Sequence, residues 1–138
     1  MKRLISTITL LVLVVTLCST RANFVLIEGK DPLLIIPVSA TIYYPSVAQC
    51  DDTPYETASM AKINKDHPEK HRWVAVSRDI KAQLNFGDKI FVMGTGVYDG
   101  YWEVQDLMNK RFTNKIDFLV SKNCKRGHWK NVEIIIVK

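Results

Sequence analysis

The chain has 138 residues, with 19 Lys and Arg against 14 Asp and Glu, which gives a net charge of +5 at pH 7. Three of the basic residues lie in the first 22 positions. The other 116 residues carry 16 basic and 14 acidic side chains, a net charge of +2, and their number suits one domain with one core. So small an excess leaves no electrostatic footprint for nucleic acid, and we expect no nucleic-acid partner.

Residues 1–22 have the pattern of a secretory signal peptide. Two basic residues precede an uncharged apolar run over 4–17, and small residues follow as far as Ala22. Because this run is short for a membrane span, we expect cleavage after Ala22 and export to the periplasm or the extracellular side of the cell envelope. Cys18 leaves a lipoprotein as the alternative, although Leu17 is larger than the residue that lipid-attachment signals prefer. Membrane attachment is expected only in that case.

Two cysteines, Cys50 and Cys124, remain after cleavage, and an exported chain meets an oxidising compartment. A disulfide between them would close a long loop and contribute up to a few kcal/mol. Two buried thiols are the alternative, since spacing alone does not show whether the residues lie within reach. Three histidines share no ligand spacing with the cysteines, so we expect no metal site. They are His67, His71 and His128.

Short β-branched and aromatic runs separated by turn residues recur along the mature chain. In chain order, strands are predicted at 38–44, 73–76, 89–93, 101–105, 116–120 and 131–137. An extended lead-in over 23–38 precedes them. The run 134–137 is too apolar to face water on both sides, so we expect it inside a closed sheet. The pattern favours a mainly β fold, either a small barrel or a sandwich.

The longest predicted connection lies between the first two strands. A loop over 46–59 holds a strong turn signal around Asp52, and 60–72 reads as an exposed connection with room for one helical turn. Aspartates in such turns usually accept hydrogen bonds from their own backbone. Further on, the run from Ser77 to Asp79 is expected to cap a short helix over 80–84.

Asp106 and Asp117 flank the polar segment between the fourth and fifth predicted strands. One carboxylate would end a strand and the other would begin the next. If those strands pair, their backbones lie about 4.8 Å apart and the acids converge on one site. Two carboxyl groups that lie close together can have different pKa values, and such a pair is what general acid/base cleavage of a glycosidic bond requires. The alternative is that both are solvated or cap loop amides.

An ordered set of motifs carries a resemblance to a known family. The motifs are Ala40-Thr41-Ile42-Tyr43-Tyr44, Asp52-Thr53-Pro54, Thr57-Ala58, Val74-Ala75-Val76-Ser77-Arg78-Asp79, Phe86-Gly87-Asp88-Lys89-Ile90, Val104-Gln105-Asp106-Leu107-Met108-Asn109-Lys110-Arg111 and Asn114-Lys115-Ile116-Asp117. In this order they resemble the three-aspartate (3D) domain, which belongs to the double-psi β-barrels similar to rare lipoprotein A. The chain is also similar to the catalytic domain of membrane-bound lytic transglycosylase A. The resemblance covers residues 39–138.

The resemblance implies an all-β, six-stranded double-psi β-barrel that binds peptidoglycan glycan strands as a monomer. It gives Asp117 the role of protonating the oxygen between N-acetylmuramic acid and N-acetylglucosamine, with Asp106 beside it. The sugar's own 6-hydroxyl then attacks and leaves a 1,6-anhydro product, without metal or cofactor. The resemblance also implies further site residues. They are Asp79 as a third acid, and Asp52, Thr53, Ser77, Asn109, Lys110 and Arg111 as substrate-binding residues.

Two motifs depart from the family pattern. The usual Ala-Val-Asp-Pro has Ser77 in place of its aspartate, and Asp79 follows two places later, so either Asp79 replaces the first family aspartate or that position is lost. The Asp-Thr-Gly-Gly loop of the transglycosylases is here Asp106-Leu107-Met108-Asn109. A non-catalytic peptidoglycan-binding or wall-loosening module is therefore the alternative function. Exposed Tyr98 and Trp102 beside the acids would suit sugar stacking, whereas most such aromatics are core.

Overall fold

The computed structural model describes residues 23–25, 33–48, 52–124 and 127–137. The predicted signal peptide over 1–22, with Cys18 inside it, lies outside the described residues. So does Cys50, one half of the predicted disulfide. Cys124 is described, and its Sγ lies 3.5 Å from Ser121 Oγ. Within the described ranges, no helix has the length and apolar character needed to cross a bilayer.

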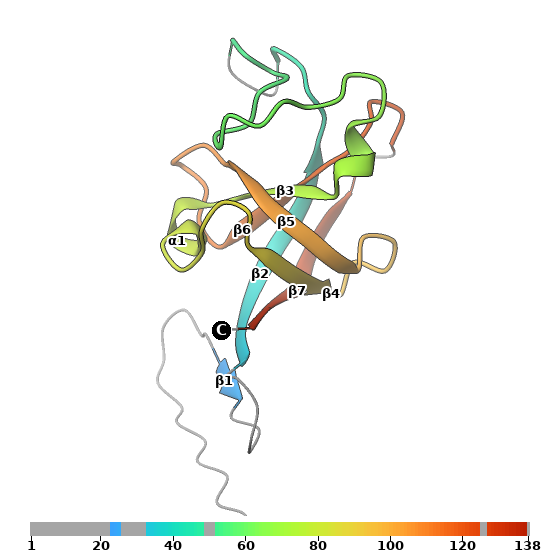
Figure 1. Ribbon diagram of the computed structural model, residues 1–138. Coiled ribbons are helices and arrows are strands. Elements are labelled where there is room, and N and C mark those ends of the chain that lie inside the picture. The colour runs from blue at the N-terminus through green and yellow to red at the C-terminus, as the bar shows by residue number, and fades with distance from the viewer. Residues whose placement is uncertain (1–22, 26–32, 49–51, 125–126, 138) are drawn as a thin grey trace, which may run out of the picture.

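Six strands close into a barrel, and the predicted six-stranded fold is confirmed (Figure 1). Around the barrel the order is β2 (Leu33–Tyr43), β6 (Lys115–Leu119), β3 (Trp73–Val76), β5 (Gly100–Leu107), β4 (Lys89–Met93) and β7 (His128–Val137). The circle closes because β7 pairs with β2. A three-residue strand, β1 (Asn23–Val25), pairs with the start of β2 and takes no part in the closure.

The two halves of the barrel interlock. β2 runs parallel to β6, and β3 runs parallel to β5, while the other barrel pairs are antiparallel. Each parallel pair joins a strand from the first half of the barrel to one from the second half. Exchanging the first three barrel strands with the last three reproduces the same neighbours. This is the connectivity of a double-psi barrel, and it makes most of the strand pairing long-range.

The barrel interior is filled by side chains at alternate strand positions, as a closed sheet requires. Trp102, Phe118 and Tyr98 form an aromatic cluster there, with 4.5 Å between the ring centroids of Trp102 and Phe118. Trp102 is 2% exposed. Trp102 therefore belongs to the core, while Tyr98 is partly buried against it, and neither lines the pocket that contains the two acids. β7 is paired on both edges, and its Ile134 and Ile136 are buried, as the apolar run predicts.

The first barrel strand is longer than predicted. β2 begins at Leu33, so the second part of the expected lead-in over 23–38 is a barrel strand with Leu34 and Ile36 buried. Pro37 lies within this strand and does not end it. β1 pairs with 33–35 and β6 with 39–43, so one edge of β2 has no described partner at Pro37. A missing backbone N–H is tolerated at such an edge position.

Two short helical turns lie in the connections. The first, η1 (Pro68–His71), supplies the single turn predicted for 60–72. The second, α1 (Arg78–Lys81), begins two residues before the predicted 80–84 helix. Ser77 occupies its N-cap position but makes no side-chain cap bond. The hydroxyl of Ser77 instead accepts a hydrogen bond from the backbone N–H of Lys115, at 3.1 Å.

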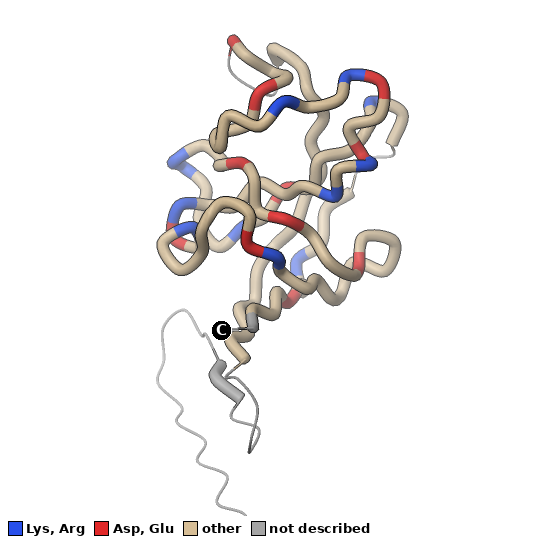
Figure 2. Tube along the Cα trace, in the orientation of Figure 1, with Lys and Arg blue, Asp and Glu red and all other residues tan. Residues whose placement is uncertain are grey.

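Charged side chains of both signs are interspersed along the described trace (Figure 2). The connecting residues 45–48 and 52–72 gather at one end of the barrel, while β1 and the start of β2 project from the other end (Figure 1). This leaves one barrel end covered by long loops that carry both acidic and basic residues.

Replacing Ile134 with alanine tests the interior assignment of β7. We expect a loss of about 2–5 kcal/mol in the free energy of unfolding, because Ile134 is fully buried inside the barrel. Ile135→Ala is the matched control, since Ile135 is only partly buried and faces the outside of the same strand. Urea unfolding of both variants measures the difference. Equal losses would contradict this arrangement.

Candidate functional site

Four residues form one row across four adjoining strands. Thr41 of β2 is in register with Asp117 of β6, Asp117 with Ala75 of β3, and Ala75 with Asp106 of β5. The residues on either side of Ala75 are Val74 and Val76, which belong to the barrel core. Because side chains alternate along a strand, the row faces outward. The structure thus brings the two predicted acids to one face.

The sequence suggested that the two acids lie on strands that pair with each other. In the structure their strands do not pair. β5 and β6 both pair with β3, which lies between them. Two strand spacings place the backbones of Asp106 and Asp117 roughly 9 to 10 Å apart. Asp106 is the penultimate residue of β5, close to the strand end predicted for it, whereas Asp117 is central in β6 and does not begin it. The position between them is held by Ala75, whose methyl group leaves room above the sheet.

A β-bulge turns Asp106 toward this face. Val74 is opposite Val104, but the next residue, Ala75, is opposite Asp106, so Gln105 is an extra residue in β5. Trp102 and Val104 point into the core. Strict alternation would send Asp106 inward with them, into an apolar interior. The extra residue reverses the alternation and presents the carboxylate outward, a use of bulges that is common beside active sites.

Asp106 is held by three hydrogen-bond donors. The hydroxyl of Tyr43 donates to Oδ2 at 3.0 Å, and the N–H groups of Ala58 and Leu107 each donate to Oδ1 at 2.9 Å. Such donors stabilise an ionised carboxylate. The bond from Ala58 also fastens the covering loop to the barrel. Asp106 therefore fixes one wall of the site.

Asp117 has a different environment. Its burial raises its pKa to about 6, against the opposing effects of a hydrogen bond from Thr41 and the positive charge of Lys115. The negative charge of Asp106 adds to the rise. The Thr41 hydroxyl donates to Asp117 Oδ1 at 2.8 Å. With that pKa, about a tenth of the molecules carry a proton on Asp117 at pH 7, and most do at pH 5. The site can thus offer a proton.

A pocket of about 400 Å³ opens over the row, within the usual range for ligand sites. Of the predicted binding residues, it includes Thr53, Asn109 and Arg111. The sequence reasoning did not assign several other lining residues. They are Tyr43, Pro54, Glu56, Thr57, Ala58, Ala75, Arg78, Leu107, Met108 and Phe112. Strand alternation could have identified Tyr43, because it lies two residues after Thr41 and so faces the same side of the sheet. The residues at 54–58 come from a loop whose path no local pattern fixes.

The other predicted site residues do not line the pocket. Asp79 is exposed and accepts a hydrogen bond from the N–H of Asn114 at 2.8 Å. Burial acts to raise the pKa of Asp79, but hydrogen bonds from Ser77, Asn114 and its own helix outweigh it and lower that pKa. Asp79 thus holds the turn before β6, where Asn114 has a positive φ of 53°. Asp52 and Lys110 are exposed, and neither lines the pocket.

Within the described ranges, no group of three or more His, Cys, Asp or Glu side chains could hold a metal ion. Comparisons of the chain with protein-family models, with curated proteins and with solved structures find no match. The row of residues and its pocket are therefore the basis for a functional proposal.

Asp117→Asn should remove one component of the pH dependence of stability. The pKa of Asp117 is raised on folding, so the folded protein keeps a proton that the unfolded chain loses above about pH 4. The wild-type free energy of unfolding should fall by roughly 2 to 3 kcal/mol relative to the variant as pH rises from about 4 to about 6, and the difference should then level off. Urea unfolding at several pH values measures it. A difference that stays constant with pH would contradict the assignment.

Proposed function

We propose that this protein is exported and acts on peptidoglycan as a lytic transglycosylase. The bond cleaved is the one between N-acetylmuramic acid and N-acetylglucosamine. The observation that supports this most directly is a pair of unequal carboxyl groups beside one pocket. Asp117 has a pKa of about 6, while Asp106 is surrounded by donors. A carboxyl group poised near the working pH is what general acid catalysis of glycosidic cleavage requires.

The proposed reaction uses one acid twice. Protonated Asp117 gives its proton to the glycosidic oxygen as the bond from that oxygen to C1 of the muramic acid breaks. The resulting carboxylate then accepts the proton of the C6 hydroxyl of the same sugar, and the C6 oxygen bonds to C1. The product is a 1,6-anhydro sugar, no water is consumed, and Asp117 ends protonated as it began.

Asp106 acts beside it in two ways. Its negative charge raises the pKa of Asp117 and favours the positive charge that develops on the sugar ring during cleavage. Its bond to the N–H of Ala58 holds the covering loop over the pocket. Arg78 and Arg111 line the same pocket and supply donors for the polar groups of the glycan.

Hydrolysis is the competing reaction at such a site. An inverting glycosidase holds its carboxyl groups about 6.5 to 9.5 Å apart, with a water between them. The two-strand spacing of the acids here leaves room for one. Both oxygens of Asp106 already accept hydrogen bonds, however, which leaves less of the carboxylate free to hold that water. We therefore favour the route that needs only Asp117.

Binding without cleavage is the second candidate. It is favoured by Met108, which is 7% exposed and lines the pocket at a loop where the similar transglycosylases carry glycine. A side chain there takes up space that glycine leaves open. A protein that binds glycan strands or loosens the wall would keep its affinity without Asp117.

Asp117→Asn should abolish the release of soluble anhydro-muropeptides from purified sacculi, because an amide N–H is far too weak an acid to protonate the glycosidic oxygen. Mass spectrometry of the soluble fraction measures the product. Asp79→Asn is the matched control, since Asp79 lies outside the pocket, and it should keep most of the activity. Retained activity in Asp117→Asn would refute the mechanism. Products with reducing ends would indicate hydrolysis, and pellet binding without product would favour the binding module.

The dependence of kcat/KM on pH should follow the protonation of Asp117. We expect kcat/KM to fall above about pH 6, because the free enzyme then loses the proton on Asp117. The hydrogen bond from Thr41 lowers the pKa of Asp117, so Thr41→Val should move the falling limb to higher pH. Initial rates on sacculi from pH 4 to 8 measure the shift. An unmoved limb would show that another group controls the profile.

A further inference from the structure

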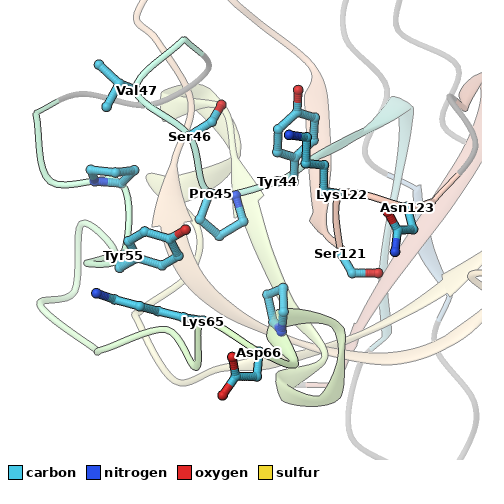
Figure 3. Close-up of a pocket in the computed structure, with 12 residues that line it drawn as sticks. Tyr44, Pro45, Ser46, Val47, Tyr55, Lys65, Asp66, Ser121, Lys122 and Asn123 are labelled. Atoms are coloured by element: carbon cyan, nitrogen blue, oxygen red, sulfur yellow. The ribbon is translucent and has the colours of Figure 1, made fainter.

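A second pocket, of about 500 Å³, lies beside the first (Figure 3). Pro54 lines both pockets, so the segment 53–56 forms the ridge between them. The backbone of this ridge is held at two points. The N–H of Glu56 donates to the carbonyl of Thr53, and the N–H of Ile63 donates to the carbonyl of Tyr55, both at 2.9 Å. The two pockets are thus separated by a short ridge whose backbone is held by hydrogen bonds.

The second pocket differs from the first in charge. Lys65 and Lys122 line it with a single acid, Asp66, so its lining carries a net charge of +1. The first pocket has three acids against two arginines. A ligand that spans the ridge would therefore meet carboxylates on one side and an excess of ammonium groups on the other.

Its walls combine aromatic and cationic groups. Figure 3 shows Tyr55 and Lys65 on one side, with Tyr44 and Lys122 on the other. The Nζ of Lys65 lies 4.9 Å from the centroid of the Tyr55 ring. Pro45 lies between these two sides. This combination suits a chain with short apolar side chains and free carboxylates.

We propose that the second pocket binds the peptide stem of the peptidoglycan substrate. This inference rests on the proposed function of the acid site. The stem is attached to the lactyl group of muramic acid, the sugar whose glycosidic bond is cleaved. With that sugar at Asp117, a stem that crosses the ridge at Pro54 enters the second pocket. Its carboxylates meet Lys65 and Lys122, and its alanine side chains contact the tyrosine rings.

The kinetic test compares intact sacculi with the same sacculi stripped of their peptides by an amidase. We expect the wild type to release anhydro products from intact strands with a kcat/KM up to about thirtyfold higher, since two exposed ion pairs contribute at most about 1 kcal/mol each. Lys65→Ala/Lys122→Ala should lose this preference and keep its activity on stripped strands. Lys89→Ala/Lys130→Ala is the matched control, because both lysines are exposed and line neither pocket.

The outcomes separate the two proposals. Equal rates on both substrates, or a preference that survives in the double variant, would overturn the peptide site and leave the transglycosylase intact. A double variant that weakens on stripped strands as well would mean that the second pocket holds sugars, which also overturns it. Absence of anhydro product from both substrates would count against the proposed function.

A binding measurement tests the site without turnover. Free tetrapeptide stem titrated into the isotope-labelled protein should shift the backbone amide NMR signals of Tyr55, Lys65 and Lys122. The signals near Asp117 should change less, because the free stem carries no sugar. Lack of any shift at the second pocket would overturn the proposal whatever the activity, and its loss in the lysine double variant would support it.

Discussion

The four residues of β3 determine where the two acids, Asp106 and Asp117, lie. Val74 and Val76 are fully buried, so Ala75 between them has to face outward. Because β3 is paired on both edges, its register also sets which residues of β6 and β5 stand beside Ala75. A slip of one residue along β6 would replace Asp117 beside Ala75 with a core residue, Ile116 or Phe118. The burial of Val74 and Val76 thus sets the position of Asp117, and the bulge at Gln105 sets that of Asp106.

The site works against the stability of the fold. Burial that raises the pKa of Asp117 makes its ionised form costly, and the nearby charge of Asp106 adds to that cost. A barrel selected for stability alone would have a neutral residue at this position. Retaining an acid there is the kind of local penalty that folds accept at functional positions. Thr41 reduces the penalty with one hydrogen bond and does not remove it.

Local sequence patterns located most of the strands, because alternation and turn residues are visible over five or six positions. They also placed both acids at one site, although the assumed pairing was wrong. The features that the sequence did not reveal depend on strand partners that are distant along the chain. No pattern around Gln105 marks it as a bulge, since the extra residue is defined only by its partner on β3. The full length of β2 also escaped prediction, because whether Pro37 is tolerated within a strand depends on which edge of β2 lacks a neighbour. Asp79 resembled a site residue and stabilises a turn.

The closure of the barrel has a consequence for the order of synthesis. β2 is the first barrel strand to be made, yet its neighbours in the circle are β6 and β7, the last two. No shorter nascent chain can complete the cylinder, and the row that contains Thr41 and Asp117 does not exist until β6 has emerged. Until β6 and β7 have both been made, the barrel stays open and β2 has unpaired edges. The pairing that aligns Thr41 with Asp117 therefore forms late in the assembly of the barrel.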